Sequence, residues 1–265
     1  MAKKGDVGKV WDYIVDTQVW KSIIRHGYPD SPRNRSLAVM ANVFLHLHPI
    51  RLRKSGLRVR YTWCMGGLTF FLFLVETITG LLLMFYYRPT AEFAYHDIEY
   101  LRAGDVPLGT MREIHRWGAH AMVITIWLHM MRVFLTGAYK PPREFNWGVG
   151  VILLVLTLLL SFTGYLLPWD QLAMWAITVG TNMARATPLL GHEGPGAALI
   201  MVGDITVVHA ASDVRFGLLG ARFVGPPAIL RFYVLHCVGF PLIAAFLIAV
   251  HFWRVRKDGG ISGPL

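Results

Sequence analysis

Long apolar runs, interrupted by few charges, dominate the pattern of hydrophobic and polar positions along this chain. Four such runs cover about residues 63–87, 114–136, 147–167 and 231–254. The first contains one acid, Glu76, and the third contains no charged residue. Each run is near or above the roughly 20 residues that a helix needs to span a bilayer. The pattern therefore predicts an all-α membrane protein built as a bundle of four transmembrane helices.

The segments outside the four runs predict surface elements. Apolar residues recur at helical spacing on one face of residues 7–26, which predicts an interfacial helix lying on the membrane. Residues 1–60 are expected to form a surface segment, and residues 61–265 the four-helix domain. Between the third and fourth runs, residues 173–183 and 204–214 are each expected to form a short helix.

The distribution of lysine and arginine predicts how the chain lies in the membrane. Twelve lie in residues 1–62, three in 132–146 and three after Trp253, which places 18 on one side against seven in the other two connections. The positive-inside rule puts both termini on the cytoplasmic, electrically negative side. The formal net charge of +10 is then explained by membrane topology and by attraction to anionic lipid. Nucleic-acid binding is therefore not expected.

Two pairs of histidines stand on two of the apolar runs. His115 and His129 are 14 residues apart, and His236 and His251 are 15 apart. On a helix each spacing is about four turns and places both members within about 60° of one direction. Buried ionisable groups are costly in a bilayer, and neutral imidazole is a frequent haem ligand. The pattern predicts two haem irons, one near each face of the membrane, although hydrogen bonding to a neighbouring helix would explain any single histidine.

Glycines and arginines around these positions extend the haem prediction. Two pairs of glycines repeat the spacing of 14 and are expected to let a flat macrocycle approach the backbone, with small-residue helix packing as the alternative. Arginines near the histidines are expected to pair with haem propionates, with snorkelling to lipid head groups as the alternative. The glycines are Gly66, Gly80, Gly150 and Gly164, and the arginines are Arg112, Arg116, Arg132, Arg231 and Arg256.

Long stretches of the chain resemble the cytochrome b/b6 family in its split, b6-type form. The resemblance covers about residues 60–183 and 230–265. It is carried by WCMGGLTFFLFLVETITGLLLMFYYRPT, MREIHRWGAHAMVITIWLHMMRVFLTGAYKPPRE, GYLLPWDQLAMWA and RFYVLHCVGFPLIAAFLIAVHFWRVRKDGGISGPL. The spacing of 15 on the last run is similar to the b6 type, and no PEWY motif occurs. The family's quinol-site motif is therefore expected on a separate subunit.

The resemblance implies a subunit of a quinol–cytochrome c or plastocyanin-type oxidoreductase that couples electron transfer to proton translocation. His115 and His236 are expected to hold the positive-side b haem, and His129 and His251 the negative-side b haem. Quinol is expected to be oxidised at the positive side and quinone reduced at the negative side. The residues expected around the quinol are Tyr165, Trp169, Asp170 and Trp175.

Cys64 aligns, in WCMGG, with the family cysteine that carries an extra, covalently attached haem c of the ci type. A free cysteine is otherwise an ordinary small apolar helix residue. Glu76 departs from the family, which usually has glutamine there. A buried carboxyl is expected to be protonated or paired, and we expect Glu76 to tune the positive-side haem or to pass a proton.

The resemblance also implies partners: the PEWY-containing subunit, a Rieske iron–sulfur protein, a c-type cytochrome and a second copy of the complex. The longer N-terminus and third connection suggest a bacterial cytoplasmic membrane. One rival is a dihaem cytochrome b anchor of another respiratory dehydrogenase, which would need the ligands but neither GYLLPWDQ nor Cys64. A non-redox membrane protein with intramembrane histidines is the other.

Overall fold

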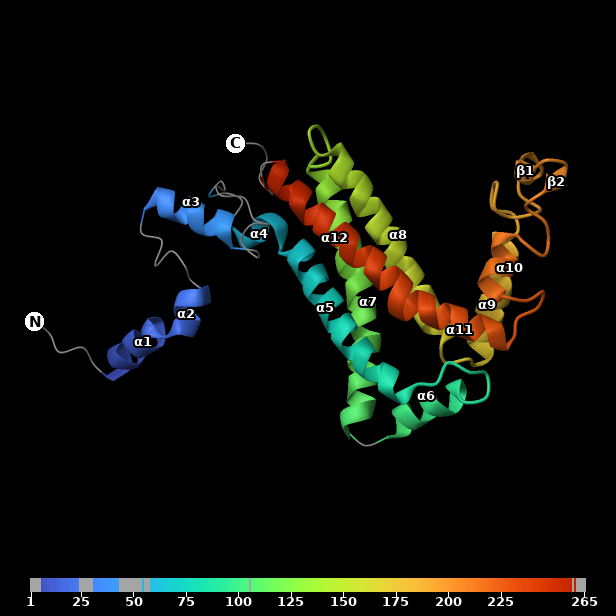
Figure 1. Cartoon of the computed structure of the whole chain (residues 1–265), viewed down its shortest axis with the longest axis horizontal. Coiled ribbons are helices and arrows are strands. Elements are labelled where there is room, and N and C mark those ends of the chain that lie inside the picture. The colour runs from blue at the N-terminus through green and yellow to red at the C-terminus, as the bar shows by residue number, and fades with distance from the viewer. Residues whose placement is uncertain are drawn as a thin grey trace, which may run out of the picture. The chain divides into compact units, whose positions relative to one another are not determined.

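The computed structural model describes residues 6–23, 31–42, 54, 58–104, 106–258 and 260. It divides the chain into two units, residues 1–58 with 252–265 and residues 59–251. In the first unit α1 (Asp6–Asp16), α2 (Gln18–Ile23) and α3 (Pro32–Ala41) are separate helices (Figure 1). Thr17 ends α1 and caps α2, since its hydroxyl accepts from Trp20 N–H at 3.2 Å. Ser31 caps α3 in the same way through Asn34 N–H.

The larger unit contains the apolar bundle. Its first half runs through α4 (Val59–Thr62), α5 (Met65–Leu83), the 3-10 turn η3 (Met84–Tyr86), α6 (Ala94–Ala103), α7 (Val106–Leu135) and α8 (Glu144–Leu166). Its second half runs through α9 (Gln171–Ala184), η4 (Ala197–Leu199), β1 (Met201–Val202), β2 (Ile205–Thr206), α10 (Val214–Leu219), α11 (Pro226–Val234), the π turn η5 (Leu235–Gly239) and α12 (Phe240–Lys257). The last turns of α12, from Phe252 on, belong to the first unit.

Within the described part of the chain, four helices are long and apolar enough to cross a membrane. They are Met65–Tyr86, Pro107–Leu135, Glu144–Leu166 and Pro226–Lys257. The predicted bundle of four spans is confirmed. The second and fourth helices begin earlier than expected. Prolines and polar residues in their first turns lower the hydropathy, so the apolar pattern did not include these turns, although such residues are tolerated at a helix start.

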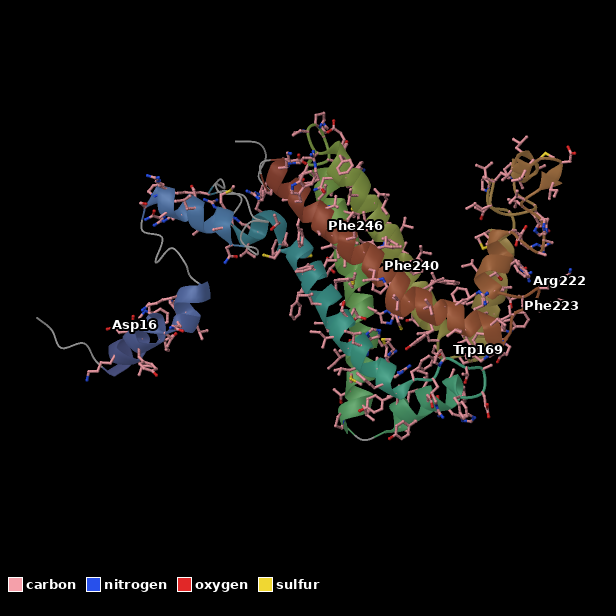
Figure 2. All side chains as sticks on the ribbon, viewed as in Figure 1. Asp16, Trp169, Arg222, Phe223, Phe240 and Phe246 are labelled. Carbon is pink, nitrogen blue, oxygen red and sulfur yellow. The ribbon has the colours of Figure 1, made fainter. Side chains whose placement is uncertain are left out.

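The outer surface of the bundle is apolar. Many large hydrophobic side chains on the spanning helices are exposed, and Figure 2 shows Phe246 projecting from α12, where it is 67% exposed. The helices instead pack on one another through a small cluster in which Phe73, Met122, Leu156 and Ala244 are buried. An apolar exterior of this extent suits a lipid environment.

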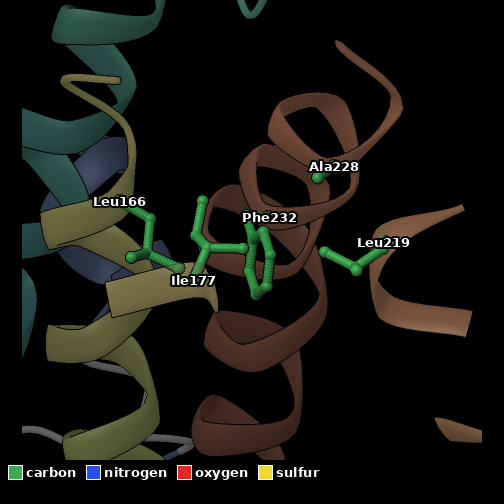
Figure 3. Packing of buried hydrophobic residues seen from close by; sticks show 5 residues of the cluster. All are labelled: Leu166, Ile177, Leu219, Ala228 and Phe232. Atoms are coloured by element: carbon green, nitrogen blue, oxygen red, sulfur yellow. The ribbon is translucent and has the colours of Figure 1, made fainter. Parts of the chain in front are cut away.

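The segment between α8 and α11 packs against the bundle through a second apolar cluster. Leu166 of α8, Ile177 of α9, Leu219 of α10 and Phe232 of α11 converge there, together with Ala228 (Figure 3). Asp170 accepts from Ala173 N–H at 2.8 Å and caps α9, so the predicted helix at 173–183 is confirmed. The connection is therefore held to the bundle rather than being an independent element.

The predicted helix at 204–214 is wrong. Gly203 has φ +62°, and it turns the chain into an antiparallel hairpin in which Val202 pairs with Ile205. β-branched residues that follow the turn favour extended structure. The helix α10 begins only at Val214, because Asp213 is its N-cap and accepts from Phe216 N–H at 2.8 Å.

An ion pair between an exposed arginine and a buried carboxylate fixes the connection between α5 and α7. Asp97 of α6 accepts three hydrogen bonds from Arg88: from the backbone N–H at 2.8 Å, from Nε at 3.0 Å and from Nη2 at 2.6 Å. The hydrogen bonds to Arg88 hold the pKa of Asp97 below its usual value. A lowered folded-state pKa stabilises the protein above the unfolded-state value of about 3.9, and this stabilisation is lost as the pH falls through the folded-state pKa.

Asp97→Asn is expected to lower the thermal unfolding midpoint at pH 7 by on the order of 2–4 °C. Scanning calorimetry in detergent between pH 7 and pH 3 measures this, and the difference from wild type should shrink at the acid end. Glu99→Gln is the matched control, since Glu99 forms an exposed pair with Arg102 and such pairs contribute little. Equal midpoints for Asp97→Asn and wild type at pH 7 would contradict the prediction.

Candidate functional site

Two pairs of histidine rings face each other inside the larger unit. The ring centroids of His115 (α7) and His236 (η5) are 6.2 Å apart, and those of His129 (α7) and His251 (α12) are 6.4 Å apart. An imidazole nitrogen binds a transition metal at about 2 Å and lies about 1.15 Å from its ring centre, so two rings on opposite sides of one metal ion have centroids about 6.3 Å apart. Both separations leave room for one metal ion.

The Nδ1 atoms of the first pair lie within hydrogen-bond distance of groups on neighbouring helices. His236 Nδ1 lies 3.1 Å from the Leu160 carbonyl and 3.1 Å from Thr163 Oγ1. His115 Nδ1 lies 2.9 Å from Thr79 Oγ1. A ring that donates its Nδ1–H to a carbonyl keeps the Nε2 lone pair free for a metal, and the partner also orients the ring.

Four glycines bring helix backbone against the four rings. A Cβ atom added to any of them would lie within van der Waals distance, or closer, of a histidine ring atom. The distances to Cε1 are 3.2 Å from Gly80 to His115, 3.1 Å from Gly66 to His129, 2.8 Å from Gly164 to His236 and 3.8 Å from Gly150 to His251. The sequence prediction placed these glycines beside a macrocycle, and the structure places them directly beside its candidate ligands.

Glu76 makes the surroundings of His115 different from those of His236. Its carboxyl Oε2 lies 3.1 Å from His115 Nδ1, and both side chains are largely buried. The other carboxyl oxygen, Oε1, has no hydrogen-bond partner in the described part of the chain. Leu160 holds the equivalent position on α8, since each residue precedes a ring-contacting glycine by four. The sequence identified this carboxyl as unusual, but not the histidine it contacts.

A cavity of about 260 Å³ surrounds the first pair of histidines. It is lined mostly by apolar side chains from α5, α7, α8 and η5, and by both rings of the pair. Arg112 and Arg116 line it as well, each paired with Glu113, at 2.7 Å and 2.6 Å respectively. Two of the arginines predicted to contact haem propionates therefore lie at this cavity.

The other predicted arginines lie elsewhere. Arg132 Nε and Nη2 are buried without a hydrogen-bond partner in the described ranges, and its guanidinium lies 4.7 Å from the Tyr61 ring centre. Arg231 Nη1 donates to the Pro227 carbonyl at 3.3 Å and does not line the cavity. Arg256 belongs to the smaller unit, where Nη2 lies 3.4 Å from Met40 Sδ.

The four residues predicted around the quinol are only partly brought together. Tyr165 lines the cavity, and its hydroxyl lies 3.0 Å from His120 Nε2. Trp169, labelled in Figure 2, packs against the apolar clusters beside α11, and Asp170 caps α9. Trp175 is 62% exposed and does not line the cavity.

Cys64 lies at a distorted helix start. It is exposed and precedes α5 with φ +52°, immediately after Trp63 with φ +51°. Two successive non-glycine residues in the left-handed region are costly and occur where the surroundings enforce them. Cys237 is partly buried in η5, and both cysteines are free thiols. The exposed sulfur of Cys64 is accessible for attachment of a group.

The sequence analysis missed the two threonines at the Nδ1 atoms. Thr79 and Thr163 each directly precede a ring-contacting glycine, so a repeated Thr-Gly pair was the available signal. No group of three or more His, Cys, Asp or Glu gathers as a metal site among the described residues. The candidate ligands are therefore two histidine pairs, which suits a macrocycle that supplies the remaining ligands of its own metal.

Four apolar spans with two facing histidine pairs define a membrane protein of the cytochrome class. The family model described as Cytochrome b/b6/petB matches residues 52–194. Cytochrome b6 of Gracilaria tenuistipitata var. liui and that of Porphyra purpurea are each 41% identical over 208 residues, covering 78% of this chain and 86% of the relative. The chain belongs to the cytochrome b/b6 family and is b6-type, as the motif resemblance predicted.

A solved structure supports the same assignment. A chain of the "Hyperthermophilic respiratory Complex III" matches with a TM-score of 0.62 at 30% identity and covers 77% of this chain. The match covers 49% of that solved chain, so the present chain spans about half its length. The family implies b-type haems, and the histidine separations of 6.2 and 6.4 Å fit bis-imidazole ligation of two of them.

Proposed function

We propose that this protein is the cytochrome b subunit of a quinol oxidoreductase complex of the bc or b6f type. The observation that carries the proposal is the pair of facing imidazole pairs, 6.2 and 6.4 Å apart between centroids, inside a four-span bundle. His115 with His236, and His129 with His251, would each hold one b haem through Nε2. When bound, the two haems supply a one-electron path from a positive-side quinol site to a negative-side quinone site.

The residues around the rings have separate roles in this proposal. The Leu160 carbonyl and the threonine hydroxyls orient the imidazoles, and the glycines leave space for them. Arg112 and Arg116 pair with propionates at the cavity, and the buried Arg132 does so near the other pair. Glu76 holds His115. Tyr165, which lines the cavity, binds the quinol.

The assembled complex requires other chains in this proposal. In this proposal a separate subunit supplies the PEWY motif and completes the quinol pocket beside Tyr165, as the resemblance to the b6 type implies. A Rieske protein takes one electron and passes it to a c-type cytochrome, and the complex is a dimer. Moving the second electron toward the negative side works against the membrane potential at about 2.3 kcal/mol per 100 mV, so it must be driven by a difference in potential between the two sites.

The membrane orientation of the proposal rests on charge. In this proposal both termini lie on the negative side of a bacterial cytoplasmic membrane. The positive-inside rule supports this side, because eighteen of the lysines and arginines fall in the two terminal segments and in the connection between the second and third spans. Helices α1 and α2 would lie on that surface. They expose Val10, Trp11, Tyr13 and Val19, and Trp11 packs edge-on against Trp20 at 5.4 Å. Indole rings favour the lipid–water interface.

A reduced-minus-oxidised spectrum of the purified complex tests the function. Two b haems for each copy of this chain are expected, as is quinol-dependent reduction of a c-type cytochrome. Absence of b-type absorbance would rule the proposal out. Reduced b haems without any quinol:cytochrome c activity would favour the anchor of a different dehydrogenase.

Cys64→Ser is expected to remove a haem that remains attached to the chain on a denaturing gel, while both b haems stay bound. The reason is that a thioether bond survives denaturation and histidine ligation does not. Haem-stained gels of wild type and the variant provide the measurement. Cys237→Ser is the matched control and should keep the stain, since its partly buried sulfur lies in η5. A stain that survives Cys64→Ser would contradict attachment at this residue.

A further inference from the structure

One turn of the helix that carries His236 is wider than the others. Figure 1 labels α11 and α12 as successive parts of one long helix, and η5 joins them. In η5 the Phe240 N–H donates to the Leu235 carbonyl, five residues earlier, whereas an α turn spans four. Such a π turn contains one residue more than an α turn. His236 lies inside it, and His251 follows 15 residues later.

The extra residue matters because every other paired position in the site is 14 residues apart. This holds for the histidines of α7 and for the ring-contacting glycines of α5 and of α8. At about 100° per residue, 14 residues end about 40° short of four full turns, whereas 15 residues pass four turns by about 60°. In a regular helix, His251 would therefore point about 100° away from the direction that the α7 pair requires.

We infer that the π turn η5 is a positioning element that absorbs this extra residue and returns His251 to the phase of a 14-residue pair. The inference rests on the proposed haem ligation. The two ring separations differ by only 0.2 Å, although the spacings along the two helices differ by one residue. C-terminal to the turn, Phe240 and Ala244 pack on the same inner cluster of the bundle as Phe73 and Met122. The face of α12 that carries His251 is thus the face turned inward.

Deletion of Val238 from the full chain tests this role. Val238 is a half-exposed residue of η5, and its deletion shortens the spacing to 14 and allows a regular α turn. The variant is expected to retain both b haems, measured as haem content per chain and as the spectrum of each haem. Deletion of Ile124 is the matched control. It is an exposed β-branched residue of α7, and its deletion leaves a spacing of 13 with no wide turn to remove. It is expected to lose at least one b haem.

The two deletions decide the inference by their contrast. Loss of a haem on deletion of Val238, or retention of both haems on deletion of Ile124, would overturn it. If the Val238 deletion does not accumulate in membranes, deletion of Cys237, which shortens the same turn, is used in its place. Failure of both variants to assemble would also overturn the inference. Wild type measured in parallel separates this result from the proposed function, because a wild-type complex without b haem would refute the haem ligation itself.

Discussion

His129→Ala is expected to leave the purified complex with one b haem per chain instead of two and to reduce quinol:cytochrome c turnover more than 100-fold. The ring of His129 faces that of His251 with the centroids 6.4 Å apart, a distance that fits one metal ion between them. Alanine would remove one of the two imidazoles proposed to hold this haem and would leave a hole beside Gly66. Pyridine haemochrome analysis and the dithionite-reduced spectrum provide the measurement.

His120→Ala is the control for this experiment. His120 is also on α7, nine residues earlier, but it hydrogen-bonds Tyr165 and faces no second histidine among the described residues. It should therefore keep both b haems. If His129→Ala kept both haems with unchanged absorbance, the ligand assignment would be wrong for all four histidines, because the same geometric argument supports each of them.

The four spanning helices could be predicted from the sequence because the physical requirement is simple. About 20 apolar residues are needed to cross a bilayer, and each run has that length. The ends of the helices could not be placed as well. Residues 106–113 and 226–230 are helical although they include prolines and polar residues, and hydropathy does not detect a helix that continues past the hydrocarbon layer.

The pairing of the histidines across two helices was implied by the family resemblance, and the neighbouring glycines followed from their spacing, whereas the groups at Nδ1 were not predicted. The two threonines and the Leu160 carbonyl at Nδ1 belong to other helices, and only the packing of α5 on α7 and of α8 on η5 brings them to the rings. The π turn was also not predicted, because a spacing of 15 alone does not show whether a helix widens or its side chain turns to another face. The predicted quinol residues were brought together only in part for the same reason, since Asp170 caps a helix and Trp175 does not line the cavity.

The glycine contacts allow a second large effect to be predicted. Gly164→Ala is expected to remove most of the b haem bound by His115 and His236 while leaving the other haem in place. The new Cβ would lie 2.8 Å from His236 Cε1, closer than nonbonded carbon atoms approach. The ring cannot retreat easily, because its Nδ1 is held by Leu160 and Thr163. Overpacking of this kind costs about 1–3 kcal/mol, which corresponds to a roughly 5- to 150-fold loss of affinity.

Gly148→Ala is the matched control, because Gly148 lies on the same helix and its Cβ would meet nothing within 4 Å. Both substitutions change helix propensity by the same amount, so any difference in haem content between the two variants reports contact with the ring. Optical redox titration resolves the two b haems and shows which one is lost. Equal haem content in both variants would show that the backbone of α8 does not constrain His236, and the close approach of glycine to the ring would then have no part in haem binding.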